Sequence, residues 1–163
     1  MKTMKGNPIT VSGTVLKVGD QAQDFIVTGN DLKDVKLSDF KRPYVLLNVV
    51  PSPDTSVCDI QTRKINESLA EFENVDVLTI SNDLPFAQKR WCGASGLAIT
   101  TLSDYKTLDF AKKYGVSIEE HRLLARSVFV LDQDREVIYV EYLDEMSKHP
   151  DYYKLIELIN QLT

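Results

Sequence analysis

A cysteine at the start of a predicted helix is the most chemically distinctive feature of this sequence. Cys58 lies seven residues before Ile65, so both side chains fall on the apolar face that Leu69 continues. Unpaired backbone N–H groups in a first helical turn favour a thiolate, whereas burial favours the neutral thiol. Thr55, one turn earlier on that face, is a candidate hydrogen-bond donor to the sulfur or to an oxygen beside it. These residues predict either a reactive thiolate or an inert buried cysteine behind an ordinary helix cap.

Cys92 is the second of only two cysteines, which are too few for a disulfide scaffold. The first residues include lysines but no following apolar segment of the kind found in secretory signals, so we expect a cytoplasmic protein. In a reducing cytoplasm, a cysteine pair is more often catalytic, redox-active or incidental than structural. Both cysteines are therefore candidates for redox chemistry.

The length and composition indicate one compact domain that spans residues 1–163. The chain is 43% hydrophobic and 26% charged, and it contains no repeat, low-complexity tract or linker. Its net charge of −5 provides no overall attraction for phosphate groups, so nucleic acid is not expected as a partner. The longest apolar stretch, at residues 45–50, is far shorter than the roughly 20 residues that cross a bilayer. We therefore expect no membrane partner.

Hydrophobic runs and helical periodicities alternate along the chain and predict an α/β fold. The run from Tyr44 to Val50 is apolar and β-branched and ends at prolines, as expected of a central strand buried on both faces. A short hairpin broken at Ser12-Gly13 is predicted within residues 9–18. Further strands are predicted at 25–27, 75–81, 99–102, 127–131 and 137–142, and helices around Cys58, from 82–85 to about Gly93, at 106–114 and from Pro150 onward. This order predicts a mixed sheet with helices on both faces.

Three segments carry a resemblance to a known family. The loop Pro51-Ser52-Pro53-Asp54-Thr55-Ser56-Val57-Cys58 resembles the active-site loop of peroxiredoxins, in the form found in the thiol peroxidase subfamily, the atypical 2-Cys peroxiredoxins. Residues 81–88 with Trp91-Cys92-Gly93-Ala94 are similar to the segment that carries the subfamily's resolving cysteine. Residues 123–127 resemble its strand entry with the active-site arginine, here Arg126. The resemblance covers nearly the whole chain and implies a thioredoxin-like fold with an N-terminal β-hairpin.

The resemblance also implies a role for each site residue. Cys58 would be the peroxidatic cysteine, whose thiolate attacks a hydroperoxide oxygen, releases water or an alcohol and becomes a sulfenic acid. Thr55 and Arg126 would stabilise the thiolate and the developing oxyanion, and Pro51 would screen the pocket from water. Cys92 would be the resolving cysteine, which condenses with the sulfenic acid of Cys58 to an intramolecular disulfide.

Partners and a conformational change follow from the same resemblance. It implies hydroperoxide substrates, thioredoxin as the reductant of the disulfide, no cofactor or metal, and a homodimer. A disulfide needs Cα atoms within about 7 Å, and cysteines in two separate helices seldom lie that close. We therefore expect the first turn at Cys58, the short helix at Cys92, or both, to unwind after oxidation.

Other functions of a cysteine protein fit the sequence less well. Cys58, Cys92, His121 and His149 could supply zinc ligands, but their wide spacing matches no compact zinc module. A phosphatase would need arginine six positions after its cysteine, where this sequence has Lys64. A second thiol three positions after Cys58, as in a dithiol oxidoreductase, is also missing. A Cys/His hydrolase has no specific support, and a peroxide-responsive redox sensor using the same cysteine pair is the alternative that stays open.

Overall fold

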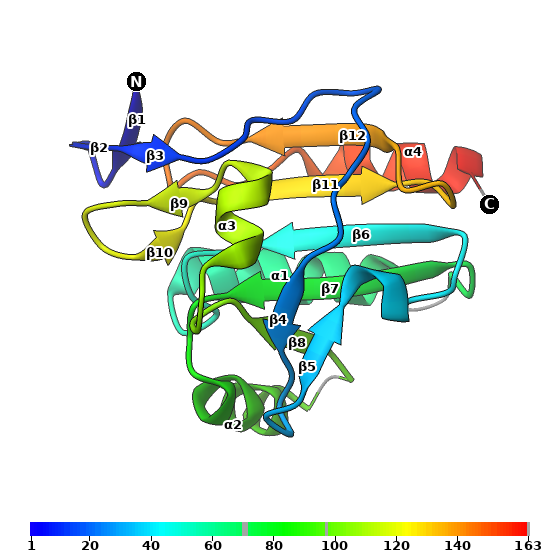
Figure 1. Ribbon diagram of the computed structural model, residues 1–163, viewed down its shortest axis with the longest axis horizontal. Helices are drawn as coiled ribbons and strands as arrows, with labels where there is room; N and C mark the ends of the chain where they lie inside the picture. Colours follow the sequence, from blue (N-terminus) through cyan, green and yellow to red (C-terminus); the bar gives the residue numbers. More distant parts are fainter. Residues whose placement is uncertain (70–71, 97, 163) are drawn as a thin grey trace.

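A seven-stranded mixed sheet forms the centre of the computed structural model, which describes residues 1–69, 72–96 and 98–162. Its strand order is β12-β11-β6-β7-β8-β4-β5, in which β6, β7 and β8 run parallel and the other pairs antiparallel (Figure 1). The strands are β4 (Ile26–Thr28), β5 (Asp34–Lys36), β6 (Tyr44–Val49), β7 (Val75–Ser81), β8 (Thr100–Ser103), β11 (Ser127–Leu131) and β12 (Val137–Tyr142). The predicted mixed sheet and the central place of β6 are confirmed.

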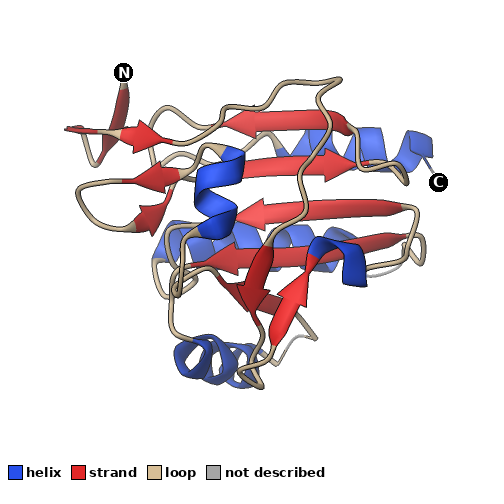
Figure 2. Ribbon diagram, viewed as in Figure 1, coloured by secondary structure: helices blue, strands red, loops and turns tan. Residues whose placement is uncertain are grey.

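Helices cover both faces of this sheet (Figure 2). They are α1 (Ser56–Leu69), α2 (Pro85–Ser95), α3 (Asp109–Tyr114) and α4 (Tyr152–Leu162), with a 3-10 turn η1 (Leu37–Asp39). Helices α1 and α4 pack through Ile65 and Leu155 onto one face, and α3 packs through Phe110 onto the other. Within the described ranges, no helix has the length and apolar character needed to cross a membrane.

Strand β6 serves both cores because its side chains alternate between them. Val45, Leu47 and Val49 join the aromatic cluster on the α3 side, whereas Leu46 joins the cluster under α1 and α4. The same alternation brings Asn48 to the α1 side, where its amide bonds with residues of that helix. A polar side chain is thus buried directly beneath the helix that carries Cys58.

The N-terminal hairpin exists, but its predicted position within residues 9–18 is wrong. Strands β1 (Lys2–Met4) and β2 (Asn7–Ile9) pair around a turn at Lys5-Gly6, while Ser12 belongs to β3 (Val11–Ser12), which pairs with β9 (Ser117–Ile118). Strand β9 also pairs with β10 (Leu123–Leu124). Lys5 and Gly6 both have positive φ, 49° and 81°, as a two-residue hairpin turn requires. Residues 15–18 form no strand.

Two helix ends also differ from the prediction. Helix α2 continues through Gly93 and ends at Gly96, whose φ of 70° is the left-handed conformation that closes a helix. Helix α3 begins at Asp109 rather than near Lys106, because Leu108 has a φ of 57° and interrupts the helical backbone. The Asp104 carboxylate accepts the Phe110 and Ala111 N–H groups, at 3.0 and 2.9 Å, and so satisfies the start of this short helix.

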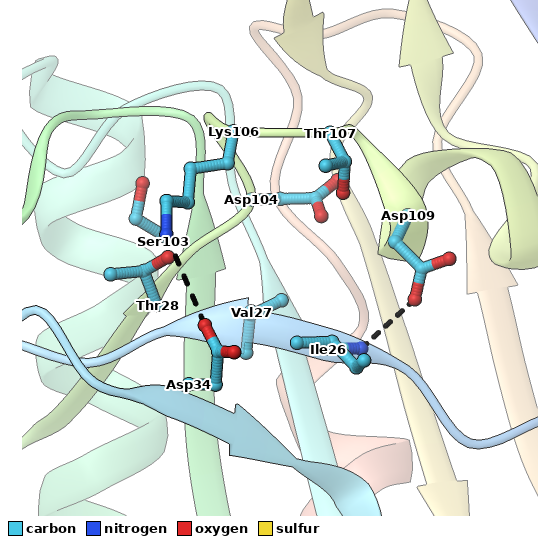
Figure 3. Close-up of a pocket in the computed structure, with 9 residues that line it drawn as sticks. All are labelled: Ile26, Val27, Thr28, Asp34, Ser103, Asp104, Lys106, Thr107 and Asp109. Atoms are coloured by element: carbon cyan, nitrogen blue, oxygen red, sulfur yellow. Dashed lines mark hydrogen bonds and ion pairs between the residues drawn. The ribbon is translucent and has the colours of Figure 1, made fainter.

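Asp104 lines a pocket of about 500 Å³ between β4, β8 and the start of α3, beside Thr107 (Figure 3). Neither cysteine lines this pocket. Burial raises the pKa of Asp104 from 3.8 to about 6 despite the two N–H donors. The folded state therefore keeps the Asp104 carboxyl protonated to higher pH than the unfolded chain does. The contribution of this protonated carboxyl to the free energy of unfolding is lost as pH rises from about 4 through 6.

We expect Asp104→Asn to abolish the part of the pH dependence of the free energy of unfolding that comes from Asp104. The free energy of unfolding of the variant, relative to the wild type, should rise by roughly 2–3 kcal/mol between pH 4 and 7, since each unit of pKa shift corresponds to about 1.4 kcal/mol. Urea unfolding at pH 4, 5, 6 and 7 measures the difference. A constant offset between the two proteins across these pH values would contradict the assignment.

Candidate active site

The loop after β6 places Cys58 in the first turn of α1. Proline at position 51 ends the strand, and the Thr55 N–H and hydroxyl both donate to the Ser52 carbonyl, at 3.2 and 3.0 Å. The Thr55 carbonyl accepts the first helical bond from the Asp59 N–H at 2.8 Å, so Thr55 caps α1. Cys58 is fully buried beneath this turn. The predicted location of the cysteine in the helix is confirmed.

Arg126, just before β11, contacts the buried sulfur directly. Its Nη2 donates to Cys58 Sγ at 3.0 Å, its Nη1 to Gln61 Oε1 at 2.7 Å and its Nε to the Met146 carbonyl at 2.7 Å. Only 2% of the arginine is exposed. A permanently charged guanidinium fixed by three acceptors stabilises negative charge on the sulfur and on any oxygen bound next to it.

A cavity of about 450 Å³ is lined by Pro51, Thr55 and Arg126 among others. Cys58 does not line it, and Arg126 is the lining residue that contacts the buried sulfur. Thr55 is exposed, and its hydroxyl proton is committed to the Ser52 carbonyl. The sequence suggested Thr55 as a donor to the sulfur, but in this arrangement its oxygen offers lone pairs to the cavity instead. The structure thus brings three of the predicted site residues to one opening.

A chain of buried amides behind Arg126 was not singled out from the sequence. Because arginine only donates, Gln61 must turn its oxygen to Arg126 and its Nε2 to the Asn48 oxygen. Asn48 Nδ2 then donates to the hydroxyls of Thr62 and Thr79, at 3.1 and 3.2 Å. Asn48 and Gln61 interrupt otherwise apolar positions of a strand and a helix face, which is the signal that could have identified them.

Cys92 lies apart from this cavity, on α2. Its sulfur contacts the Ile99 carbonyl at 3.7 Å and the Thr101 hydroxyl of β8 at 3.5 Å, and both cysteines are free thiols. Strands β6 and β7 separate β8 from β11, which begins next to Arg126. Three strand spacings amount to about 14 Å, so the contacts of the two sulfurs are at different places on the sheet.

His149 bonds elsewhere too. Its Nδ1 lies 2.8 Å from the Tyr152 hydroxyl, and burial together with the charges of Arg126 and Lys64 lowers its pKa. The neutral ring is thereby favoured, and it forms a hydrogen bond with Tyr152 rather than with Cys58. This arrangement gives no support to a Cys/His pair.

Known proteins share both the sequence and the fold. Residues 17–156 match the family model described as Redoxin. Thiol peroxidases of Halalkalibacterium halodurans and Bacillus subtilis are 58% and 52% identical, over 95% and 98% of this chain and 94% and 96% of their own. The crystal structure of a peroxiredoxin-like protein from Aquifex aeolicus, 38% identical, gives a TM-score of 0.91 over 99% of this chain and 96% of its own.

A thiol peroxidase from Chromobacterium violaceum has the same fold at only 21% identity, with a TM-score of 0.89 over 98% of this chain and 95% of its own. The fold is therefore the thioredoxin-like fold of peroxiredoxins, as the sequence predicted. The chain belongs to the Redoxin family and, within it, to the thiol peroxidases, which are peroxidase enzymes.

Proposed function

We propose that this enzyme reduces hydroperoxides, hydrogen peroxide and organic ones, at Cys58. The single observation that carries the proposal is the bond to Cys58 Sγ from the Nη2 of Arg126, a residue that also lines the cavity. The thiolate attacks one peroxide oxygen, the O–O bond breaks, and Cys58 becomes a sulfenic acid. The departing oxygen takes up a proton and leaves as water or an alcohol.

The surrounding groups suit the charge that develops in this step. The second oxygen becomes negative as the O–O bond breaks, and Arg126, whose guanidinium is held by Gln61 and the Met146 carbonyl, lines the cavity and carries a fixed positive charge. The Thr55 oxygen can accept a hydrogen bond from the peroxide O–H and so orient the substrate, since its own hydroxyl donates to the Ser52 carbonyl. Pro51 is buried at the cavity wall, and its ring carries no polar group.

We further propose that Cys92 completes the reaction. Its thiol attacks the sulfenic sulfur, water leaves, and a Cys58–Cys92 disulfide forms; thioredoxin then reduces this disulfide through a mixed disulfide. The free, half-buried Cys92 thiol on a lightly packed helix supports this role. A homodimer in the cytoplasm is part of the same proposal, and sedimentation of the purified protein measures the dimer.

Intact mass before and after one equivalent of hydrogen peroxide tests the cysteine roles. The reduced wild type should lose two hydrogens, Cys92→Ser should gain one or two oxygens, and Cys58→Ser should stay unchanged on the same timescale. Adding thioredoxin with its own reductase should then return the wild type to the dithiol mass. Both thiols still titratable in the treated wild type would overturn the proposal.

A further inference from the structure

The two helices that carry the cysteines are joined by side chains directly beside those cysteines. Trp91, the neighbour of Cys92 in α2, donates its indole N–H to the carboxylate of Asp59, the neighbour of Cys58 in α1, at 2.9 Å. Arg63, one turn further along α1, donates its Nε to both oxygens of the same carboxylate, at 3.0 and 3.1 Å. These three side chains therefore connect α1 to α2.

Two further contacts of Arg63 reinforce the connection. The guanidinium carbon lies 5.9 Å from the centre of the Trp91 ring, within the range of a cation–π contact. Its Nη1 also reaches the Ser95 carbonyl in the last turn of α2, at 3.5 Å. Asp59, Arg63 and Trp91 are all half-buried, so their contacts are less screened than those of a surface ion pair. We call this set the Asp59–Arg63–Trp91 clamp.

Besides the clamp, few contacts within the described ranges hold helix α2: Gln88 donates to the Leu102 carbonyl at 2.9 Å, and the Cys92 sulfur lies 3.7 and 3.5 Å from oxygens of Ile99 and Thr101. The helix lies at the margin of the fold next to β8 (Figure 1), and among its residues only Pro85 and Gln88 are buried. Leu84, just before the helix, and Phe86 within it are 53% and 68% exposed. An element with so few buried apolar side chains detaches at low cost, and polar contacts then make up much of what retains it.

A second link lies where the two helices begin. Asp83 accepts the hydroxyls of Ser52, in the loop before α1, and of Ser81, at 2.8 and 2.7 Å. Gln88 of α2 in turn donates to the Ser81 oxygen at 3.0 Å. Loss of the clamp alone would therefore loosen the C-terminal part of α2, where Cys92 lies, and leave its start anchored.

Disulfide formation is incompatible with the clamp in its present form. Asp59 lies in the first turn of α1, and unwinding that turn to expose Cys58 ends its one-turn spacing with Arg63. Unwinding α2 at Cys92 instead moves Trp91 away from Asp59. Either movement that the disulfide requires breaks a bond of the clamp.

We propose that the Asp59–Arg63–Trp91 clamp holds α2 in place in the dithiol protein and must open before Cys92 reaches Cys58. The inference rests on the proposed function. Two reactions compete for the Cys58 sulfenic acid: Cys92 converts it to a disulfide with loss of water, or a second hydroperoxide oxidises it to sulfinic acid and is itself reduced. The strength of the clamp sets the rate of the first reaction and hence the division between the two.

Trp91→Phe tests the proposal, because it keeps an aromatic ring and removes the N–H donor. Quenched-flow mass spectrometry after one equivalent of hydrogen peroxide should show disulfide formation about fivefold faster than in the wild type, with sulfenic acid formation unchanged. The sulfinic fraction at excess peroxide should fall correspondingly. Arg63→Gln is the second variant, and it keeps the only tryptophan, so Trp91 fluorescence should change at the rate of disulfide formation.

Amide hydrogen exchange in the reduced protein tests the clamp without any peroxide. Residues in the C-terminal half of α2 should exchange about fivefold faster in both variants, whereas the control Lys89→Gln, an exposed residue of the same helix, should match the wild type. Unchanged exchange in both variants would overturn the proposal, as would slower disulfide formation, which would mean that the contacts guide Cys92. A wild type that forms no sulfenic acid would refute the proposed function instead, and the exchange result would still decide whether the clamp holds α2.

Discussion

Replacement of Arg126 by glutamine is expected to lower the second-order rate constant for oxidation of Cys58 by hydrogen peroxide by about 10²- to 10³-fold. Removing one fixed donor to a developing oxyanion has an effect of this size, and Arg126 also contributes the only charge bonded to the sulfur among the described contacts. Arg126→Lys keeps the charge, but a single ammonium cannot reach Cys58, Gln61 and the Met146 carbonyl together. The rate constant of Arg126→Lys should therefore be about tenfold higher than that of Arg126→Gln.

Stopped-flow oxidation of the reduced protein over a range of peroxide concentrations measures these rate constants. Lys148→Gln is the matched control, because it removes one positive charge from the loop that holds Met146 while its side chain is exposed. It should react within twofold of the wild type. Equal rates for Arg126→Gln and the wild type, with both folded by circular dichroism, would show that the guanidinium does not assist the reaction.

The sheet was predicted well because its longer strands each have a clear sequence pattern. Strands β7, β11 and β12 match the predicted residues 75–81, 127–131 and 137–142 at both ends, since each is an apolar, β-branched run bounded by turn residues. The hairpin was misplaced because a glycine indicates a positive φ but does not show whether the structure uses it for a hairpin turn or for a close approach of two segments. Gly13, with φ of 111°, lets the chain pass against α3, where an added Cβ would lie 2.7 Å from the Ala111 carbonyl oxygen.

The site was predicted in part, and the limit is physical. A motif gives the residues that surround a reacting sulfur, and Pro51, Thr55 and Arg126 do share one cavity. It does not give the direction of a hydroxyl proton, which for Thr55 depends on the nearby Ser52 carbonyl. Contacts between distant segments, such as the bond from Trp91 to Asp59, depend on how helices pack and have no local pattern in the sequence.

Asn48→Leu is expected to lower the free energy of unfolding by about 3–5 kcal/mol. Leucine has a similar size, but it leaves three buried groups without their partner: Gln61 Nε2 and the hydroxyls of Thr62 and Thr79. Each unpaired buried polar group costs about 1–3 kcal/mol. Urea unfolding measures the loss. Without the Asn48 oxygen, Gln61 is no longer held in the orientation that fixes Arg126, so peroxide oxidation of Cys58 should also slow, by about tenfold.

A second substitution separates lost hydrogen bonds from simple misfit. Thr79→Val replaces a hydroxyl by a methyl group and should destabilise the wild type, because Asn48 Nδ2 then loses an acceptor. In the Asn48→Leu protein the same change removes a hydroxyl that has already lost that partner, and it should stabilise the fold instead. This reversal of sign is the expected coupling of a buried hydrogen-bond network. Equal effects of Thr79→Val in the two proteins would show that Asn48 acts through its volume. The hydrogen bonds that link Thr79 to Arg126 would then contribute no coupling free energy.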